Sequence, residues 1–133
     1  MILTPNTSTS IPRRILIIDD EESIRSLLDE FLVIEGFDVK TAASGFEGLK
    51  ALKDEEFGLI ICDVSMPGMD GFQVFESVLK INPSQKFLFI TGYNFEGSNK
   101  NLQGKSLGLL RKPFHLTDLQ YFISRVFPTM EKV

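Results

Sequence analysis

The sequence predicts an α/β fold: a doubly wound sandwich of three layers, in which five helices cover the two faces of a five-stranded parallel sheet. Five short apolar runs alternate along the chain with segments whose apolar residues recur at helical spacing. Most of these runs lack polar alternation, which is typical of strands buried on both faces of a sheet. We expect the strand order 2-1-3-4-5, one of the two common doubly wound arrangements and the one called flavodoxin-like.

The first strand is expected over Ile15–Ile18, and the acidic run Asp19–Glu22 follows it directly. A helix should come next, because acids favour the N-terminal end of the helix dipole and Gly36 is a typical stop. Its inward residues are expected to be Ile24, Leu27, Leu28, Phe31 and Leu32. The alternating segment Phe37–Ala42 predicts a strand near an edge of the sheet.

The second helix is expected over Gly45–Asp54, with its apolar residues on one face: Phe46, Leu49 and Leu52. The third strand, Leu59–Cys62, is wholly apolar, and Asp63 should lie where the chain leaves the sheet. Asp70 is a good N-cap for a third helix, which Asn82-Pro83 would stop. The fourth strand is expected over Phe87–Ile90 and ends in Thr91.

The segment from Tyr93 to Lys105 should form only a short or frayed helix, because its glycines and asparagines oppose one. The fifth strand is expected over Leu107–Leu110 and leads into Lys112-Pro113. The last helix should turn five residues inward, namely Leu116, Leu119, Phe122, Ile123 and Val126. Thr117 and Gln120 could form a capping box at its start.

One domain is expected over residues 13–128, between disordered tails at 1–12 and 129–133. The net charge of −4 and the lack of a basic cluster argue against nucleic acid as a direct partner. No run approaches the ~20 apolar residues that cross a membrane. The single cysteine, Cys62, excludes an internal disulfide and suits the cytoplasm; it is expected to be a small buried hydrophobe.

Polar groups follow four of the predicted strands: Asp19 and Asp20, Asp63, Thr91, and Lys112. In the order 2-1-3-4-5 these four strands are consecutive, so the groups line one edge of the sheet. Neighbouring strands lie ~4.8 Å apart, which puts the fifth strand about 14 Å from the first. Only a long side chain can span this distance, and a lysine side chain is long enough to do so.

Three carboxylates at such an edge repel, each pair by about 3 kcal/mol at ~5 Å, and a divalent cation would remove this cost. Oxygen ligands favour Mg²⁺, with Mn²⁺ as the alternative. Asp63 would then be a nucleophile for a phosphoryl group, assisted by Thr91 and Lys112. The alternatives are structural roles. Asp19 and Asp20 could be helix-capping acids, Lys112 could be a surface residue, and Glu21 and Glu22 could form a solvated first turn. His115, the only histidine, reads as a helix-start surface residue and not as a ligand.

With these motifs assembled, the chain resembles the receiver domain of bacterial two-component response regulators over roughly Arg13 to Phe127. The matching motifs are Ile17-Ile18-Asp19-Asp20-Glu21, the stretch from Asp63 to Gly71, Thr91-Gly92 and Lys112-Pro113-Phe114. The resemblance implies a phosphoacceptor, not an enzyme in its own right, whose Asp63 takes phosphate from a sensor histidine kinase, a phosphotransfer protein or a small donor. It also implies that Asp20, Asp63 and the backbone carbonyl of Ser65 ligate Mg²⁺, with Asp19 acting through water.

The resemblance further implies an output face on the fourth helix, the fifth strand and the last helix, which acts on an effector domain or protein. The chain would be a monomer, or a weak dimer through this face. The aromatic switch residue usual in the family is Leu109 here, three positions before Lys112. We therefore expect ordering of the loop and helix from Asn94 to Gly104 to carry the signal. In the family, the residues at Ser65 and Tyr93 influence the lifetime of the phosphate.

Three other functions stay open. A receiver-like docking module would work without phosphorylation, and Leu109 is compatible with one. A phosphohydrolase of the haloacid dehalogenase group would have a second aspartate two residues after Asp63, where Ser65 stands. A flavodoxin-type carrier would need a phosphate-cradling loop after the first strand, where the chain has acids.

Overall fold

Five parallel strands form one sheet in the order β2-β1-β3-β4-β5. The computed structural model describes residues 11–92 and 99–128. The strands are β1 (Arg14–Ile18), β2 (Asp38–Ala42), β3 (Leu59–Asp63), β4 (Phe87–Thr91) and β5 (Gly108–Arg111). The predicted fold, strand order and edge position of the second strand are confirmed. The expected tails lie largely outside the described residues, and those boundaries stay predictions.

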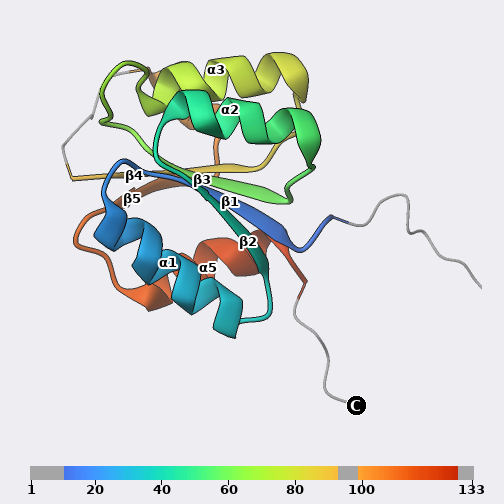
Figure 1. The fold of residues 1–133 in the computed structure, drawn as a ribbon, viewed down its shortest axis with the longest axis vertical. Helices are drawn as coiled ribbons and strands as arrows, with labels where there is room; N and C mark the ends of the chain where they lie inside the picture. Colours follow the sequence, from blue (N-terminus) through green and yellow to red (C-terminus); the bar gives the residue numbers. More distant parts are fainter. Residues whose placement is uncertain (1–10, 93–98, 129–133) are drawn as a thin grey trace, which may run out of the picture.

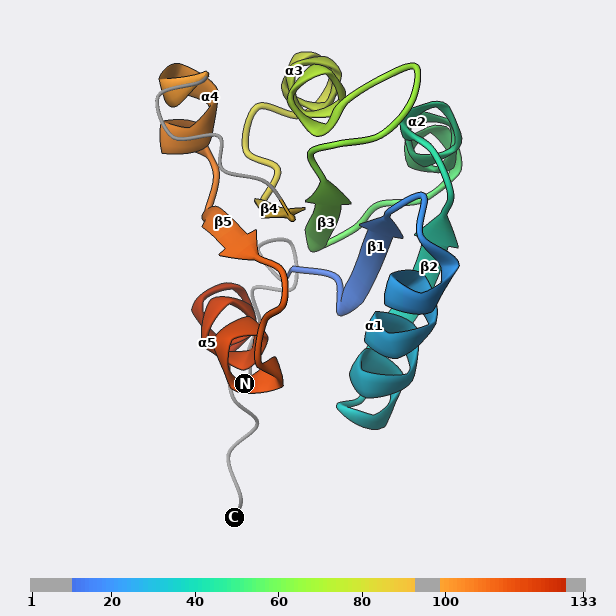
Figure 2. The ribbon, with the colours of Figure 1, turned by 90° about the vertical axis from the view of Figure 1, so that its left-hand side faces the viewer.

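Helices cover both faces of the sheet. Figures 1 and 2 show α2, α3 and α4 on one side and α1 and α5 on the other. The helices are α1 (Glu22–Ile34), α2 (Gly45–Asp54), α3 (Gly71–Ile81), α4 (Lys100–Lys105) and α5 (Leu116–Val126). The six-residue α4 agrees with the predicted short helix, although residues 93–98 before it lie outside the described part of the chain.

The core has two halves because successive strand side chains point to opposite faces. Along β1, Leu16 and Ile18 belong to the half beneath α2 and α3, whereas Ile15 and Ile17 belong to the half beneath α1 and α5. All four are fully buried. This double burial explains why the apolar runs in the sequence are continuous.

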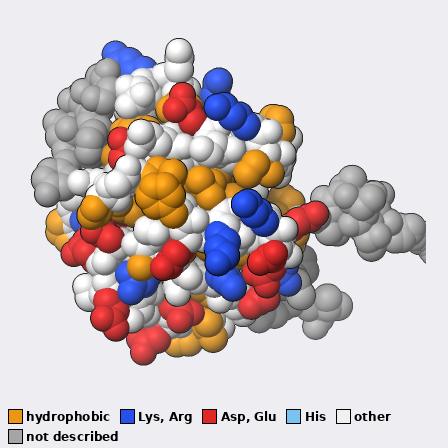
Figure 3. All heavy atoms as spheres, turned by 45° about the horizontal axis from the view of Figure 1, so that its top comes forward, with side chains coloured by type: hydrophobic (Ala, Val, Ile, Leu, Met, Phe, Trp, Pro, Cys, Tyr) orange, Lys and Arg blue, Asp and Glu red, His pale blue; other side chains and the backbone are white. Residues whose placement is uncertain are grey.

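The predicted inward face of α2 was wrong in one residue. Phe46 is 60% exposed, while the small residues Gly45, Gly48 and Ala51 face the protein. A Cβ on Gly48 would lie 2.3 Å from Cδ1 of Ile18, so α2 approaches β1 too closely for any larger residue. The outer surface on the side of α2 and α3 shows hydrophobic side chains next to basic ones (Figure 3).

Replacing Gly48 by alanine should test this close packing. We expect Gly48→Ala to lower the free energy of unfolding by about 1–3 kcal/mol, because the added methyl must displace a fully buried Ile18 side chain. Gly104→Ala is the matched control, since nothing lies within 4 Å of the added Cβ. It should be neutral or more stable by up to about 1 kcal/mol. Urea unfolding of both variants measures the difference, and equal midpoints would contradict the prediction.

Two further expectations were wrong at helix surfaces. Leu27 is 44% exposed, because Leu28 and Leu32 already face the sheet and Leu27 lies about 100° around α1. The capping box predicted at Thr117 and Gln120 does not form, because α5 begins at Leu116 with exposed His115 as its N-cap. The His115 N–H instead faces the carboxylate of Asp118 at 3.4 Å. Within residues 11–92 and 99–128, no helix has the length and apolar character needed to span a membrane.

Candidate functional site

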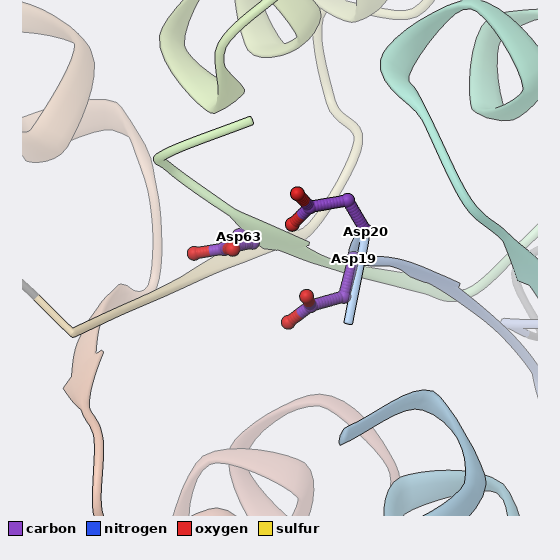
Figure 4. A group of neighbouring side chains, drawn as sticks. All are labelled: Asp19, Asp20 and Asp63. Carbon is purple, nitrogen blue, oxygen red and sulfur yellow. The ribbon is translucent and has the colours of Figure 1, made fainter. Parts of the chain in front are cut away.

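Three aspartates meet at the carboxyl ends of β1 and β3. Asp63 is the last residue of β3, and Asp19 and Asp20 come directly after β1. One carboxylate oxygen from each lies within 4.8 Å of the others. Figure 4 shows the three carboxylates turned toward the same side of the two strands. The predicted strand order therefore brings these acids together, as the sequence implied.

The two buried carboxylates, Asp19 and Asp63, differ in how their oxygens are paired. Asp19 is fully buried, and its Oδ1 accepts a hydrogen bond of 2.9 Å from the Glu21 backbone N–H. Arg25 holds the same loop by donating from Nη1 to the Asp19 carbonyl at 2.8 Å. Oδ2 of Asp19 is paired with the Lys112 ammonium at 3.2 Å, whereas among the residues described no group donates to Oδ1 of Asp63. A buried oxygen without a donor is costly, so Oδ1 of Asp63 is a candidate for binding a cation.

Lys112 supplies the positive charge of the site. Its Nζ lies 2.6 Å from Oε1 of Glu21, 3.2 Å from Oδ2 of Asp19 and 3.6 Å from Oδ2 of Asp63. The residue follows β5, so its side chain crosses the end of the sheet to reach groups that follow β1. The Lys112 side chain thus spans the end of the sheet, as the sequence predicted.

The environment raises the pKa of both buried acids. Burial, reinforced by the nearby charge of Asp19, raises the pKa of Asp63 to about 6, although Lys112 and a hydrogen bond from the Ser65 backbone act in the opposite direction. Burial also raises the pKa of Asp19. Burial lowers the pKa of Lys112, but its pairing with Glu21, Asp19 and Asp63 outweighs this, so the net shift is upward. The site therefore contains more negative charge than one ammonium balances.

The residues present suit a hard divalent cation. The cluster offers only oxygen ligands, it carries uncompensated negative charge, and the buried Oδ1 of Asp63 has no donor among the described residues. It opens into a hollow of about 650 Å³ lined by Asp20, Glu21, Asp63, Ser65, Met66, Pro67, Gly92 and Lys112. Mg²⁺ and Mn²⁺ bind such carboxylate sites and keep open positions for water or phosphate oxygens. The three acids could thus hold a metal.

The other predicted site residues are placed as follows. Thr91 is the fully buried last residue of β4, and its carbonyl accepts a 2.7 Å hydrogen bond from the Lys112 backbone N–H. Ser65 is exposed and lines the hollow. Leu109 is half-buried on β5, against the core beneath α2 and α3. Glu21 is exposed, as expected, and it is also the nearest partner of Lys112, which only the folded geometry reveals.

The raised pKa of Asp63 predicts a pH-dependent stability. Because this pKa, about 6, lies above the ordinary 3.8, the folded chain binds the proton more tightly than the unfolded one. The resulting stability is fully present below about pH 4 and is lost as the pH rises through 6. Over this window we expect the metal-free protein to lose up to about 3 kcal/mol relative to Asp63→Asn. Urea titrations of both proteins across this range measure it; parallel pH profiles would contradict it.

Comparison with known proteins gives consistent matches. The response regulator receiver domain model matches residues 15–124, a range that contains every residue of the site. Response regulator receiver protein CpdR of Brucella abortus is 33% identical over 108 residues, which are 80% of this chain and 90% of CpdR. Transcriptional regulatory protein GlrR of Escherichia coli is 38% identical over 82 residues, 62% of this chain but only 18% of GlrR. Response regulator protein TrrA of Thermotoga maritima, solved in complex with Mg(2+)-BeF, has a TM-score of 0.78 and 32% identity over 86% of this chain and 98% of TrrA.

Proposed function

The chain belongs to the response regulator receiver family, the signalling modules of two-component systems, and from that premise we propose that Asp63 is its phosphoacceptor. The observation that carries the proposal is the position of Asp63: a buried carboxylate at the end of the central strand, next to two further acids and 3.6 Å from the Lys112 ammonium. No other described acids gather into such a cluster of potential metal ligands.

In the proposed reaction a carboxylate oxygen of Asp63 attacks the phosphorus of the donor, and the bond from phosphorus to the donor's leaving atom breaks. The product is an aspartyl phosphate. Lys112 would pair with the phosphoryl oxygens as charge builds on them, and the Thr91 hydroxyl would donate to one of them. Asp20, Asp63 and the Ser65 carbonyl would hold Mg²⁺, with Asp19 acting through water. When bound, the ion supplies charge neutralisation between the acids and the phosphoryl group.

The donor is proposed to be a sensor histidine kinase or a phosphotransfer protein. TrrA was solved with Mg(2+)-BeF, which supports a site for Mg²⁺ here as well. GlrR is called a transcriptional regulatory protein, and this chain matches only a small part of it, so an effector domain or protein as the output partner is a proposal. We also propose an output face on α4, β5 and α5, a monomeric or weakly dimeric state, and a cytoplasmic location.

Signalling without an aromatic switch is also part of the proposal. Leu109 occupies the usual position of that residue, and only Leu102 and Leu109 of α4 and β5 contact the core beneath α2 and α3. Ordering of the segment before α4 would then report the phosphate. Residues 93–98, Tyr93 among them, lie outside those that the structure describes.

Intact-mass measurement after incubation with acetyl phosphate tests the phosphoacceptor function. With Mg²⁺, the chain should gain the mass of one phosphoryl group, and hydroxylamine should remove it, because acyl phosphates react with this nucleophile. Chelation of the metal before incubation should prevent the gain. A chain that binds a histidine kinase but never gains this mass would instead be a docking module, and steady release of phosphate from generic esters would indicate a phosphohydrolase.

A further inference from the structure

Glu21 is the group closest to the Lys112 ammonium. Its Oε1 lies 2.6 Å from Nζ, compared with 3.2 Å for Asp19 and 3.6 Å for Asp63. The Glu21 side chain is 56% exposed, whereas those of Asp19 and Asp63 are almost completely buried. The ammonium is thus held toward the solvent side of the site by an acid at its rim.

Hydrogen bonds also fix the backbone of Glu21 beside the site. Its N–H donates to Oδ1 of Asp19, and its carbonyl accepts from the Arg25 backbone N–H at 3.1 Å as the N-cap of α1. The side chain therefore starts from a rigid point between Asp19 and the first helical turn. One residue orients Asp19 through its amide and Lys112 through its carboxylate.

From this geometry we infer that Glu21 is a positioning residue for the cation site: it holds the Lys112 ammonium at the rim, away from Asp63, and so leaves the Asp63 oxygens open to a divalent metal. The inference rests on the proposed function and adds a residue to it. Lys112 and a metal ion compete for the same carboxylates, because both are cations within reach of Asp63. Without Glu21, Asp19 and Asp63 are the ion-pair partners that remain for the ammonium among the described residues.

The predicted effect of Glu21 on metal affinity does not require Glu21 to be a ligand of the metal. Glu21 need not touch the metal, yet its removal weakens metal binding in two ways, through loss of one nearby negative charge and through movement of the ammonium toward Asp63. Only the second effect passes through Lys112. A change of the same charge on Glu22, an exposed neighbour in the first turn of α1, produces the first effect alone.

Calorimetric titration of the whole chain with Mg²⁺ alone tests the inference. We expect Glu21→Gln to raise the dissociation constant for Mg²⁺ by about fivefold to tenfold, the size of a unit-charge interaction across a few ångström of partly solvated protein. Glu22→Gln should change it by less than about twofold, because an exposed charge is screened. Unfolding curves check that both variants are as stable as the parent chain.

A double-mutant cycle separates the two effects. In a Lys112→Met background the ammonium is gone, so Glu21→Gln should weaken Mg²⁺ binding clearly less than it does in the parent chain, because only the loss of its own charge remains. An equally large effect of Glu21→Gln with and without Lys112 would overturn the inference, as would equal effects of the two glutamine variants in the parent chain. If the parent chain itself binds no Mg²⁺ and gains no phosphoryl group, the proposed function fails instead.

Discussion

Asp63→Asn is expected to abolish phosphorylation by acetyl phosphate, with a loss of at least about a thousandfold in rate. The carboxamide has almost the same shape as the carboxylate, so the fold should be kept, but its oxygen is a far weaker nucleophile and forms no stable acyl phosphate. The site as a whole should also gain stability near neutral pH, because burial opposes the charged form of Asp63. Intact-mass measurement over time gives the rate.

Asp70→Asn is the matched control for this substitution. Asp70 lies in the same segment after β3, at the N-cap of α3, where its Oδ1 accepts a 2.9 Å hydrogen bond from the Gln73 backbone N–H. Asparagine caps helices about as well as aspartate, so the fold and the phosphorylation rate should both be unchanged. If the Asp63→Asn variant still gained a phosphoryl group, the result would indicate Asp19 or Asp20 as the acceptor instead.

The fold could be predicted because its main signal is local. β1, β3 and β4 are short, mostly apolar runs, and because they are buried on both faces they show no polar alternation. Where the prediction was wrong, packing between elements decided the outcome. Phe46 is exposed because α2 turns its glycines and Ala51 inward, and α5 starts before Thr117 because His115 serves as its N-cap.

The candidate site was predictable for a topological reason. Parallel strands all end at one edge, so the order 2-1-3-4-5 alone brings together groups that are as distant in sequence as Asp19 and Lys112. The choice among ion-pair partners was not predictable. Glu21 and Glu22 look alike in the sequence, and only the direction of each side chain at the start of α1 makes one the partner of Lys112 and leaves the other in solvent.

Lys112→Met should slow phosphorylation by about a hundredfold to a thousandfold, the usual effect of removing one charged group that stabilises a transition state. Methionine keeps most of the length and apolar contacts of the lysine stem, so the change removes mainly the ammonium. Lys86→Met is the control, because Lys86 is exposed and forms no ion pair with the described residues; its rate should equal that of the parent chain.

Measuring Mg²⁺ affinity on the same Lys112→Met protein identifies what the lysine does. The ammonium shares Asp19 and Asp63 with any bound cation, so its removal should leave Mg²⁺ binding as tight as before or make it tighter. Slow phosphorylation together with undiminished metal binding would assign Lys112 to the phosphoryl oxygens. If both fall together, the lysine instead supports the shape of the acidic cluster, and if the rate stays within about threefold of the parent, the ammonium has no part in the transfer.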